Sequence, residues 1–117
     1  MTPLTPETKN LIGENELSLM KSSSILINTA RGGIVNEEAL YNALVHNKIW
    51  AAGLDVFEHE PIDLNHPLLN LPNVVTLPHI GSASIKTRTM MAELAAENLL
   101  AALENKNPPH LVNKDAI

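Results

Sequence analysis

Three short apolar runs divide the chain at similar intervals. They cover residues 25–29, 49–55 and 73–77 and are built largely from Ile, Leu, Val and Ala. Runs without polar alternation are typical of strands that are buried in a parallel sheet. The pattern therefore predicts three strands, of which we expect at least the first two to be buried.

Apolar residues at helical spacing fill the intervals between these runs. We expect a short turn of helix starting at Thr5-Pro6, a helix over 14–20 and another over about 37–46. A long helix of about 20 residues should begin at Ser84 and end near 105–107, before a proline pair. One face of that helix carries an apolar stripe with a single polar member, formed by Met91, Leu94, Ala95, Asn98, Leu99 and Leu103.

The order of these elements is helix, strand, helix, strand, loop, strand and long helix. Such alternation is typical of an α/β fold with a parallel sheet flanked by helices. The loop over 58–72 is rich in Pro, Asn, Asp and His, and we expect Leu68-Leu69 to turn back into the core. Three strands make a small sheet of this type, because both faces and both edges need covering.

Composition narrows the classes of function. The 117 residues suffice for one small domain, and a net charge of -5 without a basic run argues against nucleic-acid binding. The absence of cysteine excludes disulfides and thiolate metal sites. No apolar run approaches the ~18 residues of a membrane span, and the first residues lack a signal-peptide pattern. We therefore expect a cytoplasmic protein that binds neither nucleic acid nor membrane.

Four polar side chains follow predicted strand ends: Arg31, Asp55, Glu60 and His79. The carboxyl ends of parallel strands share one edge of the sheet, so we expect these residues to converge there. A histidine beside a carboxylate is an acid/base pair, and an arginine can hold a carboxylate through two N–H groups. Together they suit proton transfer on a small carboxylic acid.

Each of these residues also has a purely structural interpretation. Arg31 could lie in an ordinary surface loop, His79 could be a turn residue, and Asp55 could cap a loop. The acids of the 58–60 segment could simply be solvated. His59, Glu60 and His66 do not have the spacing of a closed zinc site, so we predict no metal.

Three motifs resemble the D-isomer-specific 2-hydroxyacid dehydrogenases. They are Asn28-Thr29-Ala30-Arg31-Gly32-Gly33, Gly53-Leu54-Asp55-Val56-Phe57-Glu58-His59-Glu60-Pro61 and Pro78-His79-Ile80-Gly81-Ser82-Ala83. They occur in order and at the family's spacing over nearly the whole chain. Within the family, segments such as Asn65-His66-Pro67-Leu68-Leu69 look most like glyoxylate/hydroxypyruvate reductases.

The resemblance implies a role for each site residue. Arg31 would bind the substrate carboxylate, His79 would donate a proton, and Glu60 would hold His79, with Glu58 as the alternative. The resemblance also implies a set of residues at the NAD or NADP cofactor: Thr2, Thr29, Ala30, Arg31, Asp55, His79, Gly81 and Ser82.

The chain departs from the family in its phosphate-binding part. Glycine occurs only at positions 13, 32, 33, 53 and 81, so the Gly-x-Gly-x-x-Gly turn is absent, as is the residue that tells NAD from NADP. The resemblance thus implies the second half of a Rossmann-like doubly wound sheet. Residues 1–83 would be the C-terminal half of the cofactor domain, and 84–117 the helix and tail that cross back to the substrate domain.

We therefore expect part of an oxidoreductase that reduces a 2-oxo acid to a D-2-hydroxy acid with NAD(P)H, inactive by itself. Its partners would be that substrate, the missing N-terminal half of the parent and, in the parent, a second subunit of a homodimer. Two alternatives remain: a non-catalytic, nucleotide-sensing scaffold like the corepressors of this fold, or a truncated product without activity.

Overall fold

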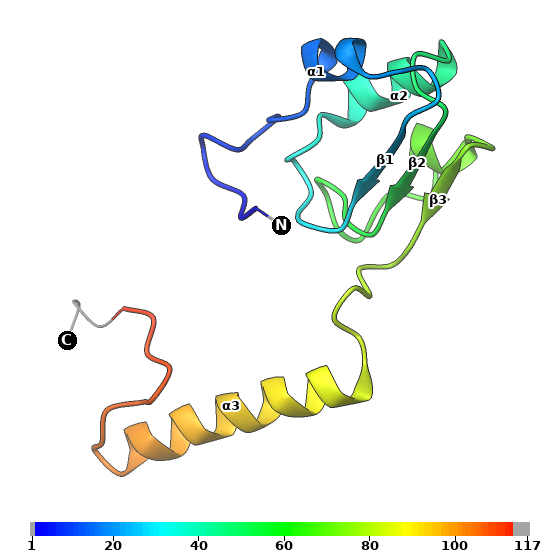
Figure 1. The fold of residues 1–117 in the computed structure, drawn as a ribbon. Coiled ribbons are helices and arrows are strands. Elements are labelled where there is room, and N and C mark those ends of the chain that lie inside the picture. The colour runs from blue at the N-terminus through cyan, green and yellow to red at the C-terminus, as the bar shows by residue number, and fades with distance from the viewer. Residues whose placement is uncertain (1, 114–117) are drawn as a thin grey trace. The chain divides into compact units, whose positions relative to one another are not determined.

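A computed structural model describes residues 2–113. The chain divides into two compact units, Met1–Gly81 and Ser82–Ile117, and each is described by itself. The first contains the sheet, and the second contains the long helix (Figure 1). Met1 lies outside the described residues, and so do residues 114–117, the end of the C-terminal region expected over 84–117.

The first unit is built on a parallel sheet of three strands in the order β1-β2-β3. The strands are β1 (Ile25–Asn28), β2 (Ala51–Leu54) and β3 (Val74–Thr76), and Gly53 pairs with Ile27 on one side and with Val75 on the other. The predicted α/β class and parallel sheet are confirmed. The strands are shorter than predicted, but the backbone pairing continues past their ends, as in the 3.0 Å bond from Asp55 N–H to the Asn28 carbonyl.

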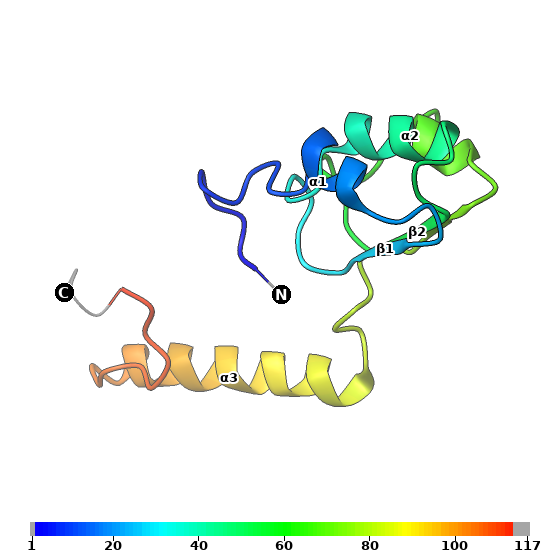
Figure 2. The same cartoon turned by 45° about the horizontal axis from the view of Figure 1, so that its top comes forward.

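One face of this sheet is covered by helices. They are α1 (Glu14–Leu19), α2 (Glu37–Val45) and the 3₁₀ helix η1 (Pro67–Asn70), and Figure 2 shows α1 and α2 on the same side of β1 and β2. Their buried side chains meet those of the strands in one apolar core, formed by Leu17, Leu26, Val35, Leu40, Ala43, Leu44, Ile49, Ala52, Leu54, Phe57 and Leu68. Leu68 is fully buried, which confirms that the long loop turns back into the core.

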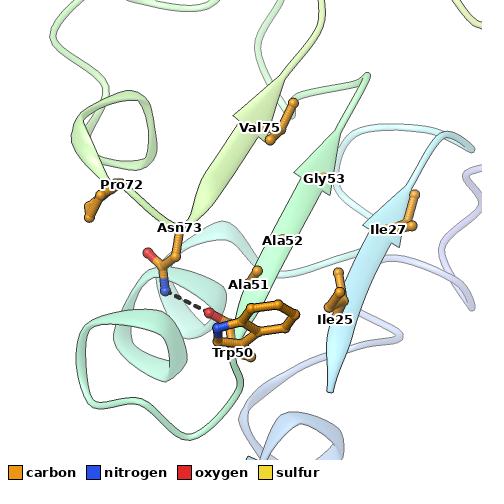
Figure 3. A pocket seen from close by; sticks show the side chains of 9 residues that line it. All are labelled: Ile25, Ile27, Trp50, Ala51, Ala52, Gly53, Pro72, Asn73 and Val75. Atoms are coloured by element: carbon orange, nitrogen blue, oxygen red, sulfur yellow. Dashed lines mark hydrogen bonds between the residues drawn. The ribbon is translucent and has the colours of Figure 1, made fainter. Parts of the chain in front are cut away.

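The opposite face of the sheet is open within the first unit. Ile27 is 72% exposed and Val75 66%, and the face holds a hollow of about 520 Å³ that also involves Trp50 (Figure 3). The prediction that the first two strands are buried is confirmed for the face that carries Leu26, Ala52 and Leu54 and is wrong for the opposite face of this unit. The reason is that α1, α2 and η1 all contribute to the core on the side of Leu26 and Leu54.

Local sequence signals explain where α2 begins and ends. Asn36 caps its start by accepting a 2.8 Å hydrogen bond from Ala39 N–H. At its end Asn47 adopts φ +54°, and the N–H groups of Asn47 and Lys48 bond back to Leu44 and Ala43. This is the Schellman arrangement that ends many helices.

The short turn of helix expected from Thr5-Pro6 is present and goes no further: the N–H groups of Thr8 and Lys9 donate to the Thr5 carbonyl at 3.1 and 3.0 Å. Thr8 Oγ1 donates to the Pro3 carbonyl at 2.7 Å and accepts from Thr5 N–H at 2.7 Å. Side-chain bonds of this kind compete with continued helix formation.

The second unit consists mainly of α3 (Ile85–Leu103), close to the predicted extent. Ser84 caps it by accepting from Thr87 N–H at 3.1 Å, and Asn105 at φ +56° ends it. No residue of α3 is buried, including those of its apolar stripe. None of the helices described over residues 2–113 combines the length and apolarity that crossing a bilayer requires.

Candidate active site

The turn that carries Arg31 is shaped by the last residue of β1. Asn28 is only 7% exposed, and its side chain spans the turn. Its Nδ2 donates to the Arg31 carbonyl at 3.1 Å, and its Oδ1 accepts from Ala30 N–H at 3.1 Å. The Arg31 side chain is exposed and donates one N–H to the Ala30 carbonyl at 2.9 Å. The guanidinium thus stands at the carboxyl edge of the sheet.

Glu60 and His79 form a direct pair at this edge. His79 Nδ1 and Glu60 Oε2 are 2.6 Å apart, and Glu60 Oε1 accepts from Phe57 N–H at 3.0 Å. The bond to His79, then the Phe57 N–H and the positive charges of His79 and Arg31 hold the pKa of Glu60 below its usual range. The charge of Arg31 therefore contributes to the electrostatic environment of Glu60.

The backbone around His79 is fixed from β2. His79 has φ +55°, a left-handed conformation that few residues other than glycine adopt. The next two N–H groups, of Ile80 and Gly81, donate to the carboxylate of Asp55 at 2.8 and 2.7 Å, and Asp55 is 3% exposed. A side chain that is buried and doubly bonded in this way can hold a conformation that costs energy locally.

A close backbone contact joins the Arg31 turn to the loop that carries Glu60. A Cβ atom built on Gly32 would lie 1.8 Å from the Phe57 carbonyl oxygen, which is far inside contact distance. Only glycine allows the two segments to approach this closely. The position of Arg31 relative to Glu60 is therefore set partly by this glycine.

The structure brings most of the expected site residues to one edge. Arg31, Glu60 and His79 share it with Asp55 and Gly81, and Thr29 and Ala30 lie in the Arg31 turn. Glu58 does not contact His79: its carboxylate lies 3.4 Å from Lys9 Nζ. The Glu60 alternative is thus the one with the geometry that an acid/base pair needs.

The two other expected cofactor residues are not joined to this group. Thr2 is half-buried in the N-terminal segment, and Ser82 belongs to the second unit. Their expected role stays a prediction.

Sequence reasoning gave no role of their own to Asn28 and Gly32, which shape the Arg31 turn and its contact with the Glu60 loop. The signal for Asn28 was a polar residue at the end of an apolar run. Gly32 acts through a contact with Phe57, more than twenty positions away, and no local pattern reports such a contact.

The residues at this edge fit the reacting end of a nicotinamide cofactor but not its phosphates. The N-terminus of α2 is capped by Asn36 and followed by the carboxylates of Glu37 and Glu38. Helix N-termini that bind phosphate offer unpaired N–H groups and positive potential, and these acids oppose both. Among residues 2–113, no three metal-ligating side chains cluster together.

An arginine and a histidine–carboxylate pair at the carboxyl edge of a parallel sheet can bind a small carboxylic acid and exchange a proton with it. The sequence pattern of one family, "D-isomer specific 2-hydroxyacid dehydrogenase, NAD binding domain", matches residues 1–81. The chain belongs to this family.

Curated relatives match over almost the whole chain. A glyoxylate reductase of Aeropyrum pernix is 55% identical over 98% of this chain and 34% of its own length. A glyoxylate/hydroxypyruvate reductase B of Pectobacterium atrosepticum is 54% identical over 98% of this chain and 36% of its own. The chain thus spans about a third of the length of these relatives.

Solved structures agree. The TT0316 protein of Thermus thermophilus has a TM-score of 0.89 and 53% identity over 96% of this chain and 36% of that protein. An NADPH-dependent glyoxylate/hydroxypyruvate reductase of Sinorhizobium meliloti, in complex with NADP and malonate, has a TM-score of 0.81 and 44% identity. The alignment covers 86% of this chain and 31% of the length of that reductase.

Proposed function

We propose that this chain supplies the substrate-binding arginine and the proton donor of an NAD(P)H-dependent reductase that converts small 2-oxo acids, of the glyoxylate or hydroxypyruvate class, to D-2-hydroxy acids. The observation that carries the proposal is the 2.6 Å contact between His79 and Glu60 beside the charge of Arg31. The 52–55% identity to relatives named glyoxylate or glyoxylate/hydroxypyruvate reductase supports this substrate class.

Arg31 selects the substrate in this proposal. A guanidinium binds a carboxylate through two parallel N–H groups, which fixes the orientation of the acid as well as its position. An exposed arginine on a turn held by a buried asparagine is suited to this task.

His79 provides the proton. Because its Nδ1 is bonded to the Glu60 carboxylate, Nε2 is the ring nitrogen that faces a substrate oxygen. Reduction adds a hydride to the carbonyl carbon and a proton to the carbonyl oxygen, so that C=O becomes CH–OH. Glu60 stabilises the protonated imidazole until the proton leaves.

A nicotinamide cofactor, when bound, supplies the hydride. The described residues offer it no phosphate site, so we propose that the rest of the reductase holds the phosphates. Whether NAD or NADP is used belongs to that part as well.

A chimera tests the proposal. This chain replaces the matching third of the Pectobacterium atrosepticum enzyme, and oxidation of NADH and of NADPH is followed with glyoxylate, hydroxypyruvate and acetaldehyde. We expect turnover of the two acids and little with acetaldehyde, which has no carboxylate for Arg31. A folded chimera without turnover of either acid would contradict the proposed function and favour a non-catalytic scaffold.

The 117-residue chain alone is the matched control. We expect it to oxidise neither cofactor, because it lacks a turn for the phosphates. Tight cofactor binding by the chain alone, measured by fluorescence titration, would place the cofactor somewhere other than proposed.

A further inference from the structure

Glu37, in the first turn of α2, connects two ends of the loop that carries Glu60. Its Oε1 accepts from Glu58 N–H at 2.6 Å, and its Oε2 lies 3.2 Å from His66 Nε2. Glu58 comes two residues before Glu60, and His66 immediately precedes η1. One carboxylate thus ties α2 to both sides of the loop.

The environment of this contact is largely closed. The side chains of Glu37 and His66 are only 17% and 24% exposed. The His66 ring stands edge-on to the buried Phe57 at 6.0 Å, and its Nδ1 is buried without a hydrogen-bond partner among the described residues. Among the described residues, the contact with Glu37 is thus the one polar contact found for this ring.

The contact leads directly to the acid/base pair. Phe57 and Glu58 are adjacent: the Glu58 N–H bonds to Glu37, and the Phe57 N–H bonds to Glu60. Glu60 in turn holds His79. From the other side, the Phe57 carbonyl lies against Gly32. The backbone of Phe57 and Glu58 therefore lies between Glu37 and Gly32, and it positions Glu60.

We propose that Glu37 is a positioning residue for the Glu60–His79 pair, acting through the Glu58 backbone and through His66. The proposal rests on the function proposed above, because it gives the pair a catalytic purpose. Glu37 itself touches neither substrate nor cofactor in this account.

A simpler interpretation is that Glu37 only stabilises the N-terminus of α2 as a negative charge. Glu38 offers a matched control, since it carries the same charge in the same helical turn but is exposed. A helix-dipole role would be shared by both acids, whereas a positioning role belongs to Glu37 alone.

The first test uses NMR on the 117-residue chain, with the carboxyl carbon of Glu60 titrated and hydrogen exchange measured at the Phe57 amide. The groups that act on Glu60 are His79, the Phe57 N–H and Arg31. In Glu37→Ala we expect the pKa of Glu60 to rise toward its ordinary value and the Phe57 amide to exchange about tenfold faster. Glu38→Ala should change neither, and Glu37→Gln, which keeps an acceptor for Glu58, should restore most of both.

One further variant keeps the test decisive. If Glu37→Ala does not fold, His66→Phe keeps the ring beside Phe57 but removes its contact with Glu37, and should shift both readouts in the same direction by less. An unchanged pKa of Glu60 and unchanged exchange at Phe57, in whichever of these variants folds, would overturn the proposal.

The second test uses the active chimera. Glu37→Ala should lower kcat about tenfold to a hundredfold with little change in the KM for glyoxylate, because misplacement of a proton donor affects the chemical step. An equal loss in Glu38→Ala, or a loss in KM alone, would contradict a positioning role. If the wild-type chimera is inactive, the proposed function fails, and the NMR test still decides whether Glu37 positions the pair.

Discussion

The Arg31 guanidinium is the group on which substrate choice depends in this account, and its planar fork has no equivalent in lysine. Arg31→Lys in the chimera keeps the charge but can form only single-point contacts with a carboxylate. We expect kcat/KM for glyoxylate to fall about tenfold to a hundredfold, the worth of a charged hydrogen bond. Steady-state kinetics check this, and an unchanged kcat/KM would remove Arg31 from the site.

The lowered pKa of Glu60 predicts an acid-dependent loss of stability. A carboxyl group whose pKa falls on folding stabilises the protein above its unfolded pKa of about 4.3, and this contribution disappears as the pH falls through the folded pKa. The difference in urea midpoint between the wild-type chain and Glu60→Gln should therefore be present above about pH 4.3 and shrink as the pH falls below it.

The effect should be small, because the Glu60 side chain is 36% exposed and its bond to His79 is screened by water. Glu38→Gln controls for the change in net charge at an exposed position. A Glu60→Gln difference that grows toward low pH would contradict the assigned pair.

The places where predicted strands end are enough to predict part of the site. The other residues act through contacts that are distant in the sequence and are therefore not predicted. Arg31, Asp55 and His79 follow strand ends, and parallel strands bring such residues together wherever the loops lead. Glu37 contacts Glu58 across 21 positions, and Gly32 contacts Phe57 across a similar gap. Contacts of this kind depend on how the loop folds back, which no local pattern encodes.

At the scale of elements, hydrophobic pattern and capping residues give the order and type of the main helices and strands. Asn36 and Ser84 cap the helices that they precede, and Asn47 and Asn105 end them in left-handed conformations. The faces of the strands are less predictable, since Ile25 and Ile27 have the apolar character of a buried strand but lie on the open face. Apolar side chains indicate that a sheet face can be buried, but they do not indicate which segment of the protein packs against that face.

Gly32 is predicted to be the least replaceable residue at the contact between the Arg31 turn and the loop that carries Glu60. In Gly32→Ala the new Cβ meets the Phe57 carbonyl at 1.8 Å, and the backbone must move. We expect a loss of about 1–3 kcal/mol or more in the free energy of unfolding, measured with urea.

Gly53→Ala is the matched control, because its Cβ would meet Ile27 Cγ1 at 3.7 Å, an ordinary contact. We expect this variant to remain within about 0.5 kcal/mol of the wild type. Equal effects of the two substitutions would contradict the close approach at Gly32.

At the scale of the whole molecule, the chain belongs to a family whose matched relatives are about three times as long, and its sheet has an open apolar face. Exposed apolar surface of this kind promotes association. We expect the purified chain to self-associate in light scattering, and Ile27→Lys to reduce the association. Leu19→Lys, at an exposed apolar position on α1, should not; equal effects of both would show that the sheet face is not involved.

The most direct measurement of the central claim is the kcat of the chimera with His79 replaced. His79→Asn removes the proton donor while leaving the Asp55 bonds to the following backbone in place. A positioned acid contributes about 10²–10⁴-fold to the rate, so kcat for glyoxylate should fall by that factor while cofactor binding is retained. A kcat within about twofold of the wild type would contradict the assignment of His79 as the proton donor, and with it the account of this site.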